Sequence, residues 1–422
     1  MEETYFALNP WWEGREFDCG ILRDEYLDDF EKFDRRKQVE VIVGSRRIGK
    51  TTIVKQMVKR RLGRKIPARD MLYLALDHPK LSGIGLSEHV RVFRKLFMHD
   101  RRKKLFLFLD EIQESPDWET ELKSLYDTEN LKIVCTGSTA SLIKTQGGKL
   151  TGRQMISTIY PLNFKEFLRF RNAALSRAEE YKLERLVEEY LNTGGYPENV
   201  IRPSEEYLYT LINDIVARDI VRLYQVKKAN LLRDLLKLLA SAVGSRTSFN
   251  KLAHVLGLSV DTVKEYIGYL ESAFLVKSLE KWTTSYSEKI YAYRKFYFHD
   301  TGLKTTLTGS GDTGFKAENA VFMHLCKKRQ DLGYFAESER EVDFVTGTFR
   351  NPFPIEVKYS AGFDWESKKF AGMKLFLHRY PKVKKALVVT KDTETQTKEG
   401  PVAISTVPLW KYLLEGEIPI EL

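Results

Sequence analysis

The sequence is poor in cysteine and has no long apolar run. Its 422 residues contain three cysteines, Cys19, Cys135 and Cys326, which lie far apart and follow no metal-ligand spacing. The seven histidines show no paired ligand spacing either, so a structural zinc site is not expected. Isolated, reduced thiols favour the cytoplasm over an oxidising compartment. The densest apolar run, residues 105–109, is far shorter than the roughly 18 residues that a membrane-spanning helix needs.

The sequence also lacks internal repeats, low-complexity segments and the pattern of a secretory signal. The first residues are acidic and aromatic rather than basic and then apolar, so they do not predict a signal peptide. A content of 43% hydrophobic and 30% charged residues excludes wholesale disorder. The charge of +10, from 68 basic and 58 acidic residues, suits a polyanionic partner such as nucleic acid, although solubility alone could account for it. At about 150 residues per domain, the length predicts roughly three domains.

Short apolar runs alternate with helical stretches between residues 39 and 160. This alternation predicts a parallel sheet covered by helices on both faces. The chain then becomes helical to about residue 240, and a compact unit at 230–273 predicts three helices with short turns. Alternating Tyr, Phe and Lys residues at 276–299 predict a β-ribbon, and the last part returns to mixed α/β structure. The predicted strands are 39–43, 71–76, 104–110, 131–138, 341–345, 353–360 and 385–390, with late helices near 315–329 and 366–379.

The strongest motif is a phosphate-binding loop between the first predicted strand and a predicted helix. Such a loop points backbone N–H groups at phosphates. Lys50 can reach the β- and γ-phosphates, and the Thr51 hydroxyl can bind Mg²⁺. Arg46 and Arg47 are expected to be structural or interfacial rather than catalytic. The residues that fit the pattern G-x-x-x-x-G-K-[ST] are Gly44, Ser45, Arg46, Arg47, Ile48, Gly49, Lys50 and Thr51, and Thr52 extends the predicted nucleotide contacts.

Two carboxylates at the end of the apolar run 105–109 predict the catalytic part of the same site. Asp110 is placed where a Mg²⁺ ligand belongs, and Glu111 could polarise the attacking water. Thr136 follows the next strand and could bind the γ-phosphate or the water, with Ser138 as a nearby alternative. Arg153 could supply positive charge from a neighbouring subunit; the alternative is a surface or salt-bridged arginine.

At this point the sequence resembles a family. The segments GSRRIGKTT, LDEIQ, CTGSTASLI, KLTGR, YPLNFKEFL and GGYPE occur in the order seen in prokaryotic, often archaeal, AAA-type ATPases. The resemblance continues past ARDI (217–220) to KFYFHDTGL and the C-terminal part, and so covers nearly the whole chain. It implies an additional-strand P-loop ATPase sheet with a helical lid, a winged-helix domain and a C-terminal PD-(D/E)xK, or restriction-endonuclease-like, α/β domain of uncertain function.

The predicted C-terminal domain carries acidic residues in an order that suits metal-dependent cleavage. Glu318 lies on a predicted helix and Asp343 on a predicted strand, while Glu356, Val357 and Lys358 lie on the next one. Alternation puts Glu356 and Lys358 on one face. Asp343, Glu356 and the Val357 carbonyl could then hold Mg²⁺ or Mn²⁺, with Lys358 orienting a water. A degenerate nuclease fold that only binds is the alternative.

The predicted winged helix offers a candidate DNA surface. Its exposed candidates are Thr262, Lys264 and Tyr269 on one helix, with Lys277, Lys281 and Lys289 along the ribbon. Asp261 and Glu265 on the same helix would repel phosphate, so contact with the ATPase or a neighbouring subunit is an equal alternative.

The leading hypothesis is a cytoplasmic, Mg²⁺- and ATP-dependent machine that binds DNA, forms a homo-oligomer such as a ring, and cleaves DNA with a metal. The alternative is a nucleotide-switched scaffold with a catalytically silent C-terminal domain that binds protein partners. The predicted divisions are an N-terminal segment (1–35), the ATPase core (36–160), the lid (161–229), the winged helix (230–300) and the nuclease-like domain (301–422).

Overall fold

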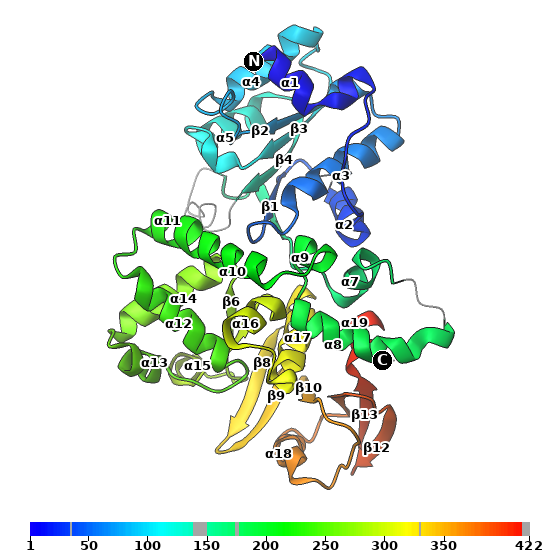
Figure 1. Ribbon diagram of the computed structural model, residues 1–422, viewed down its shortest axis with the longest axis vertical. Helices are drawn as coiled ribbons and strands as arrows, with labels where there is room; N and C mark the ends of the chain where they lie inside the picture. Colours follow the sequence, from blue (N-terminus) through cyan, green and yellow to red (C-terminus); the bar gives the residue numbers. More distant parts are fainter. Residues whose placement is uncertain (34–35, 138–149, 174–176, 329–330, 416–422) are drawn as a thin grey trace. The chain divides into compact units, whose positions relative to one another are not determined.

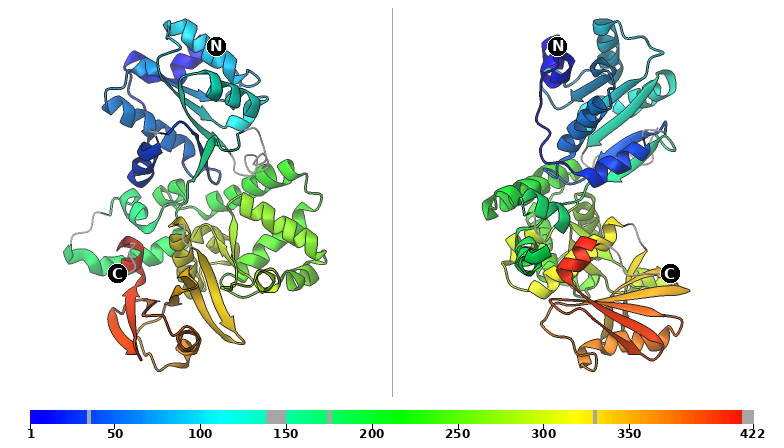
Figure 2. Two further views of the ribbon diagram at one scale, coloured as in Figure 1. Left: turned by 180° about the vertical axis from the view of Figure 1, so that it is seen from behind. Right: turned by 90° about the vertical axis from the view of Figure 1, so that its right-hand side faces the viewer.

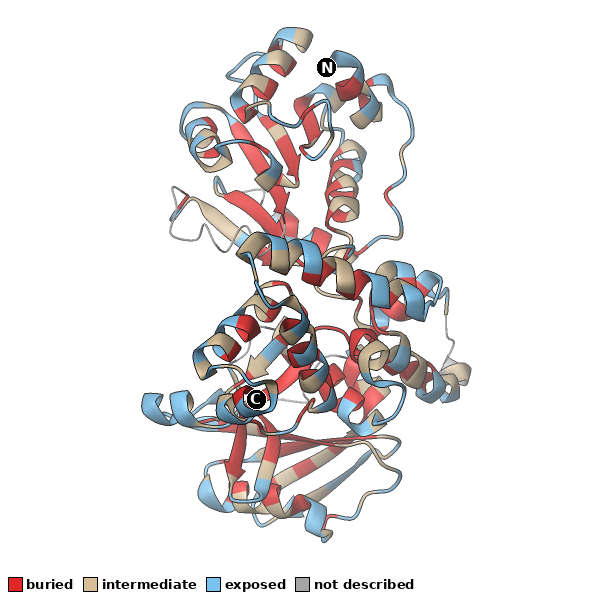
Figure 3. Cartoon of the chain, turned by 60° about the vertical axis from the view of Figure 1, so that its left-hand side comes forward, coloured by how far each residue is buried: buried red, intermediate tan, exposed pale blue. Residues whose placement is uncertain are grey.

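The computed structural model describes residues 1–33, 36–137, 150–173, 177–328 and 331–415. The chain divides into two compact units, Met1–Ile159 and Tyr160–Leu422. Figure 1 labels their helices and strands, and Figure 2 shows them from two further sides. Each unit has its own buried sheet, and Figure 3 shows that buried residues gather on the strands of both.

The described residues of unit 1 form a five-stranded parallel sheet with the order β2-β3-β4-β1-β5. Strand β4, which is late in the sequence, lies between β1 and β3 and pairs with both. The residues of β1 and β4 are buried throughout, which explains their near-continuous apolar sequences. The strands are β1 (Val39–Val43), β2 (Met71–Ala75), β3 (Leu105–Asp110), β4 (Leu131–Gly137) and β5 (Gln154–Thr158).

Helices cover both faces of this sheet. Helix α3 packs on one face, and α4 and α5 contact each other on the opposite face (Figure 1). Helix α2 packs on α3, and α1 packs on β2, the edge strand. The helices are α1 (Glu2–Leu8), α2 (Asp24–Phe33), α3 (Lys50–Gly63), α4 (Leu86–Phe97) and α5 (Trp118–Thr128), with 3₁₀ turns at Pro10–Glu13, Ala68–Asp70 and Ile112–Glu114.

The predicted parallel sheet and its first four strands are confirmed, to within one or two residues at their ends. Strand β5 was not predicted. Its sequence, QMIST, has polar residues at both ends and only one buried position, because within the described residues it is an edge strand whose one partner is β1. Edge strands of this kind carry a weak apolar pattern.

Unit 2 begins with helices. Three of them, α12, α13 and α14, match the predicted three-helix unit. Ser248 caps α13 and Ser259 caps α14, each accepting a hydrogen bond from a backbone N–H of the first turn. The helices are α7 (Phe164–Phe170), α8 (Leu183–Thr193), α9 (Pro197–Ile201), α10 (Glu205–Asp214), α11 (Arg222–Tyr224), α12 (Ala229–Ser241), α13 (Phe249–Leu256), α14 (Val260–Ser272), α15 (Tyr286–Tyr291), α16 (Thr301–Thr308), α17 (Thr313–Lys327), α18 (Ala371–Arg379) and α19 (Leu409–Glu415), with 3₁₀ turns at Arg177–Lys182 and Lys368–Phe370 and a π-helical stretch at Ile215–Val221.

The ribbon after α14 differs from the prediction in its middle. Strands β6 (Val276–Leu279) and β7 (Lys295–Phe298) pair antiparallel, as a ribbon requires. Between them, however, the chain forms helix α15 rather than continuous strand. Ser285 caps this helix by accepting a hydrogen bond from the backbone N–H of Glu288, and this local bond outweighs the alternating pattern. Lys289, predicted along the ribbon, therefore lies on α15.

The described residues of unit 2 also form a six-stranded mixed sheet with the order β12-β13-β11-β10-β9-β8. Helices α17 and α19 contact each other and pack against this sheet, while α18 packs against β8, β9 and β10. The predicted strands and helices of this region are confirmed; β8, β12, β13 and α19 were not predicted. The strands are β8 (Leu332–Glu337), β9 (Arg340–Thr348), β10 (Asn351–Lys358), β11 (Lys385–Thr390), β12 (Thr395–Glu399) and β13 (Val402–Pro408).

Among the residues that the structure describes, no helix combines the length and apolar character that crossing a membrane requires.

Candidate functional site

The loop between β1 and α3 has the backbone that a phosphate-binding loop needs. Arg47 and Gly49 both adopt left-handed conformations, with φ of 60° and 98°. At Gly44 a side chain has no room, because a Cβ atom would lie 2.7 Å from the Ile159 carbonyl oxygen. The Lys50 ammonium lies over the loop and donates to the Gly44 and Ser45 carbonyls at 3.1 and 3.2 Å. The loop therefore wraps around a fixed positive charge at the start of a helix.

Asp110 is the centre of a buried hydrogen-bond network at the end of β3. Its Oδ2 accepts from the Thr51 hydroxyl at 2.7 Å and from the Tyr73 hydroxyl at 2.8 Å. Its Oδ1 accepts from the Thr136 hydroxyl. Burial, followed by the Asp110 carboxylate, raises the pKa of Tyr73 far above its ordinary value, so Tyr73 stays a hydrogen-bond donor. Side chains from the adjacent strands β2 and β4 thus both donate to the carboxylate at the end of β3, beside the loop.

Glu111 has a strained backbone and a directed side chain. Its φ of 53° is left-handed, which is uncommon for a residue other than glycine and clusters at functional sites. Its backbone N–H donates to the Thr136 hydroxyl oxygen at 3.1 Å. The Gln113 amide nitrogen donates to Glu111 Oε2 at 2.6 Å, while Gln113 Oε1 is buried and accepts no hydrogen bond from any residue that the structure describes. The geometry can hold one carboxylate in a fixed direction next to Asp110.

The remaining predicted residues of this site are placed as follows. Ile48 is fully buried and Ser45 is buried, whereas Arg47 is exposed and Arg46 and Thr52 are half-buried. Arg153 pairs with Asp127 of α5 in the same chain, with 3.2 Å between Nε and Oδ1. Ser138 lies outside the described residues.

A segment before the first strand also reaches this loop, and sequence reasoning missed it. Gln56 of α3 donates through its amide to the Cys19 and Ile21 carbonyls, both at 2.8 Å, and accepts from the Arg23 backbone N–H. The Arg23 guanidinium donates to the Ile48 carbonyl at 3.3 Å. A glutamine inside a helical pattern gives no local signal for such contacts, because the partners are more than thirty residues away.

Asn9 ties the N-terminal segment to β2. It is fully buried, and its Oδ1 accepts from the Tyr73 backbone N–H at 2.7 Å. Its Nδ2 donates to the Tyr73 and Tyr5 carbonyls at 2.9 and 2.8 Å. The Trp12 indole donates to the Met71 carbonyl at 2.9 Å. Segment 1–13 thus satisfies the open edge of β2 at the residue whose hydroxyl binds Asp110.

The acidic residues predicted in the C-terminal region do come together. Asp343 on β9 lies beside β10, where its Oδ2 accepts from the Val357 backbone N–H at 2.9 Å and its own N–H donates to Glu356 Oε2 at 3.3 Å. The Lys358 ammonium lies 2.5 Å from Glu356 Oε1 and 3.9 Å from Asp343 Oδ2. Glu318, from α17, completes the cluster, and all three carboxylates are buried.

A second lysine, which sequence reasoning missed, lies among these acids. Lys295 on β7 is fully buried, and its ammonium lies 3.2 Å from Glu318 Oε1, 3.3 Å from Glu341 Oε1 and 3.1 Å from Asp343 Oδ1. Burial alone would lower the pKa of Lys295, but the carboxylates, Glu318 first, raise it above its ordinary value, so it stays charged. Lys295 begins the segment KFYF, whose Lys, Phe and Tyr residues belong to the run that predicted a β-ribbon, so nothing in the sequence pointed to a buried charge.

The same charges set the protonation of the cluster. Burial and the Asp343 carboxylate raise the pKa of Glu318 and of Glu356. Burial would raise the pKa of Asp343 too, but the Lys295 and Lys358 ammoniums hold it below its ordinary value.

These residues do not fit a divalent cation. An ammonium lies where oxygen ligands would have to close to about 2.0–2.6 Å on a metal ion. Over the described part of the chain, no three His, Cys, Asp or Glu side chains are grouped as metal ligands. Metal binding by Asp343, Glu356 and the Val357 carbonyl stays a prediction that this arrangement does not favour.

The predicted DNA surface is only partly available. Lys264 is exposed. Tyr269, predicted to be exposed, instead stacks on Tyr224 with ring centroids 3.9 Å apart and donates to Glu265, because two aromatic rings bury more area together than apart. The Lys281 ammonium pairs with Glu288 of α15 at 2.7 Å.

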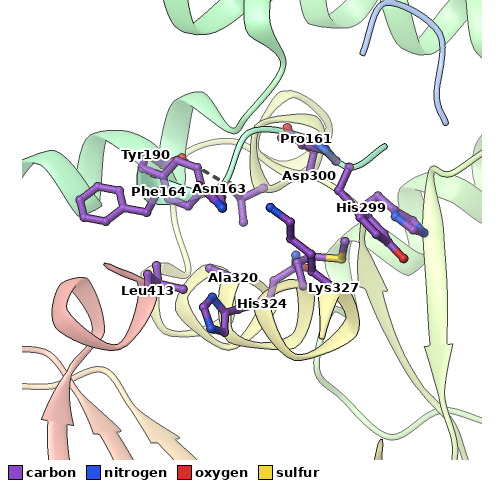
Figure 4. A pocket seen from close by; sticks show the side chains of 14 residues that line it. Pro161, Asn163, Phe164, Tyr190, His299, Asp300, Ala320, His324, Lys327 and Leu413 are labelled. Carbon is purple, nitrogen blue, oxygen red and sulfur yellow. Dashed lines mark hydrogen bonds between the residues drawn. The ribbon is translucent and has the colours of Figure 1, made fainter. Parts of the chain in front are cut away.

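A pocket of about 40 Å³ in unit 2 lies apart from the predicted sites (Figure 4). Its side chains come from segments 160–164 and 299–301 and from helices α8, α17 and α19, and no predicted site residue lines it. His299 lines it with a buried Nδ1 that has no hydrogen-bond partner among the described residues. Burial, with a smaller contribution from Lys277, lowers the pKa of His299 to about 3. The volume suits a few water molecules rather than a substrate.

Comparison with protein families divides the chain into three parts. Residues 36–168 match the family model of the AAA domain, so this part is similar to ATPase domains of the AAA type. Residues 184–314 and 313–412 match two domains of unknown function, DUF8612 and DUF4143.

Relatives that match most of the chain occur in a bacterium and an archaeon. An uncharacterized protein of Haemophilus influenzae is 26% identical over 336 residues, which cover 77% of this chain and 83% of that protein. The uncharacterized protein MJ1637 of Methanocaldococcus jannaschii is 29% identical over 395 residues, covering 85% of this chain and 82% of the relative.

Two solved structures are similar at low identity. The Walker-type ATPase PABY2304 of Pyrococcus abyssi is 15% identical with a TM-score of 0.43, covering 68% of this chain and 95% of that one. The Saccharomyces cerevisiae Hsp104–ADP complex is 15% identical with a TM-score of 0.35, covering 64% of this chain and 40% of that chain.

Proposed function

We propose that the protein is a Mg²⁺-dependent ATPase whose active site is the loop Gly44–Thr52 together with Asp110, Glu111 and Thr136. The observation that carries the proposal is the hydrogen bond between Thr51 and Asp110, which joins the loop to the end of β3. The loop N–H groups bind the phosphates, and Lys50 neutralises their charge. Three hydroxyl donors offset the cost of burying the Asp110 carboxylate beside the loop.

The oxygens at this point fit Mg²⁺. Mg²⁺ prefers hydroxyl, carboxylate and phosphate oxygens, and Thr51 and Asp110 offer the first two side by side. When bound, Mg²⁺ offsets charge on the β- and γ-phosphates. Tyr73 and Thr136 keep Asp110 in place by donating to both of its oxygens.

Glu111 acts as the residue that orients and polarises water in this proposal. The Thr136 hydroxyl holds its backbone, and the Gln113 amide holds its carboxylate. A carboxylate so directed can accept a proton from water as the bond to phosphorus forms.

Two substitutions test the proposal. Lys50→Ala should weaken ATP binding and turnover together, because it removes charge from the phosphates. Glu111→Gln should keep ATP affinity while lowering kcat by about 100-fold or more. Glu114→Gln, an exposed acid in the same turn, is the matched control and should turn over normally. Full turnover by the Glu111→Gln protein would remove Glu111 from the mechanism.

We propose further that turnover is coupled to a binding partner of unit 2. In the first version the partner is DNA, supported by the net charge of +10 and by helices α12–α14. DNA should then stimulate ATP turnover, and Lys264→Ala should reduce the salt slope of binding by about one. The position of Lys295 leaves cleavage without support, so cleavage is not part of the proposal.

The second version is a nucleotide-switched scaffold that binds protein partners and cuts nothing. The engagement of Tyr269 with Tyr224 and of Lys281 with Glu288 favours it, because both residues are committed within the chain. ATP turnover that is slow and indifferent to DNA at low salt would select this version.

A further inference from the structure

The buried acids of unit 2 gather around an ammonium group. Lys295 comes from β7, whereas its three carboxylate partners come from α17 and β9. The three nitrogen–oxygen distances lie between 3.1 and 3.3 Å, within ion-pair range although longer than the about 2.7–2.9 Å of the shortest charge-assisted hydrogen bonds. The ammonium donates hydrogen bonds to Glu318 and Asp343 and forms an ion pair with Glu341. We propose that Lys295 is the resident cation of this cluster, and that it excludes a divalent metal and joins β7 to α17 and β9.

The charges of the cluster can be balanced without a metal. Glu318, Glu341, Asp343 and Glu356 supply the carboxyl groups. Against them stand Lys295 and Lys358. In addition, the Arg246 guanidinium lies 3.2 Å from Glu341 Oε2, on the side away from Lys295. Arg246 also pairs with the exposed Glu339 at 3.4 Å. Apart from that surface pair, three cations face four carboxyl groups, so one shared proton makes these seven groups neutral.

A metal ion would have to displace Lys295 to enter. The lysine is fully buried, so its ammonium would be left without partners inside the unit. Breaking a buried ion pair in this way costs far more than the pair itself contributes. Neighbouring groups reinforce the arrangement, since the Tyr297 hydroxyl donates to Glu318 Oε1 at 2.6 Å from the same strand. Two residues of β7 therefore bind one glutamate of α17.

The contacts of Lys295 with α17 and β9 have a structural consequence. Strand β7 belongs to the ribbon that follows helices α12–α14, whereas β9 belongs to the six-stranded sheet and α17 packs against that sheet. Lys295 stabilises the contact between these parts of unit 2 through charge rather than through apolar area. Loss of the ammonium should both weaken the contact and leave carboxylates that attract a cation.

The test compares Mn²⁺ binding by the full chain without nucleotide, followed by electron paramagnetic resonance. The wild type and Asp343→Asn should bind equal Mn²⁺, because the ATPase site contributes equally to both. Lys295→Ala should bind about one additional Mn²⁺, and adding Asp343→Asn should remove it. The Lys295→Ala protein should also melt roughly 10 °C lower, and millimolar Mn²⁺ should restore about half of that loss.

Lys316→Ala is the matched control. Lys316 is equally buried on α17, but its ammonium contacts the Asn192 side chain and the Ser310 carbonyl rather than the cluster. Its loss should destabilise the chain without creating Mn²⁺ binding. A wild-type site that Asp343→Asn removes would overturn the proposal, and this comparison stands even if the Lys295 variant does not fold. A folded Lys295→Ala protein that gains no Mn²⁺ would overturn it equally.

Discussion

Single hydroxyl groups decide how Asp110 is held, and Tyr73 offers the clearest test at this scale. Tyr73→Phe removes one of the two donors to Asp110 Oδ2 while keeping the ring in its buried place. We expect kcat for ATP hydrolysis to fall about 3- to 10-fold and the Mg²⁺ concentration needed for half-maximal rate to rise, because Asp110 loses one hydrogen bond and a loss of about 1 kcal/mol corresponds to roughly a fivefold change in rate.

Tyr5→Phe is the control for this change. Tyr5 is also buried in unit 1, but its hydroxyl bonds to His89 Nδ1 at 2.6 Å and not to the site. If Tyr5→Phe and Tyr73→Phe alter the Mg²⁺ requirement alike, the effect is one of stability and the role given to Tyr73 is wrong.

A second prediction at this scale concerns His299 and pH. Its folded pKa of about 3 lies below its ordinary value of 6.5, so between these values the unfolded chain binds the extra proton. Its contribution to stability is therefore present above about pH 6.5 and is lost as pH falls toward 3, at about 1.4 kcal/mol for each pH unit.

His299→Phe provides the comparison. The ring would still pack between Tyr160 and Phe274. Denaturant unfolding between about pH 7 and pH 4.5 should show the wild type losing stability relative to the variant as pH falls. Burial raises the pKa of the neighbouring Asp300 to about 6, which acts in the opposite direction, but Asp300 is common to both proteins. A difference that does not change with pH would contradict the assignment.

At the scale of elements, segment 1–13 and strand β2 act together. Asn9 makes three hydrogen bonds from a fully buried position, and two of them hold the Tyr73 backbone. Asn9→Ala should lower the unfolding free energy of unit 1 by about 2–4 kcal/mol, because it leaves buried backbone groups without partners. It should also lower kcat, since Tyr73 positions Asp110.

Asn130→Ala is a suitable control for that variant. Asn130 donates to the Arg102 carbonyl at 2.7 Å on the exposed surface of the same unit. It should lower stability by about 1 kcal/mol or less without changing turnover. Normal kcat in a folded Asn9→Ala protein would show that the segment only stabilises the sheet.

The elements also show how far the sequence could predict this protein. The phosphate loop and the acidic end of β3 are local patterns, so Lys50, Thr51 and Asp110 could be found from a few consecutive residues. Tyr73 could not, because its hydroxyl meets a carboxylate 37 positions away and the run MLYLAL reads as plain core. Strand β5 has the polar sequence of an edge strand.

In the C-terminal cluster, too, the sequence predicted the local residues but missed a partner that only the tertiary fold supplies. Alternation along β10 correctly placed Glu356 beside Lys358, and the turn before it brought Asp343 close. The pattern could not reveal Lys295, because only the tertiary fold brings β7 against those acids. The unpredicted Lys295 therefore changes the interpretation of Glu318, Asp343 and Glu356 from metal ligands to ion-pair partners.

At the scale of the whole molecule, we predict assembly into an oligomer in which Arg153 acts on the nucleotide of a neighbouring subunit. In the single chain its guanidinium pairs with Asp127, and both side chains are partly exposed, so the ion pair contributes little and can exchange. If the protein forms an oligomer, Arg153 can leave Asp127 for the nucleotide of a neighbouring subunit, where such an arginine is worth about 10³-fold or more in rate.

Mixing two inactive variants tests this prediction. Glu111→Gln removes the water-orienting carboxylate and Arg153→Ala removes the arginine, so each alone should be nearly inactive. In a mixed oligomer some interfaces combine an intact Glu111 with an intact Arg153 from the next subunit, and ATP turnover should reappear at up to about a quarter of the wild-type rate. Light scattering with ATP and Mg²⁺ should show the oligomer under the same conditions. Two inactive proteins that stay inactive when mixed, or a strict monomer with full turnover, would assign Arg153 to its pair with Asp127 alone.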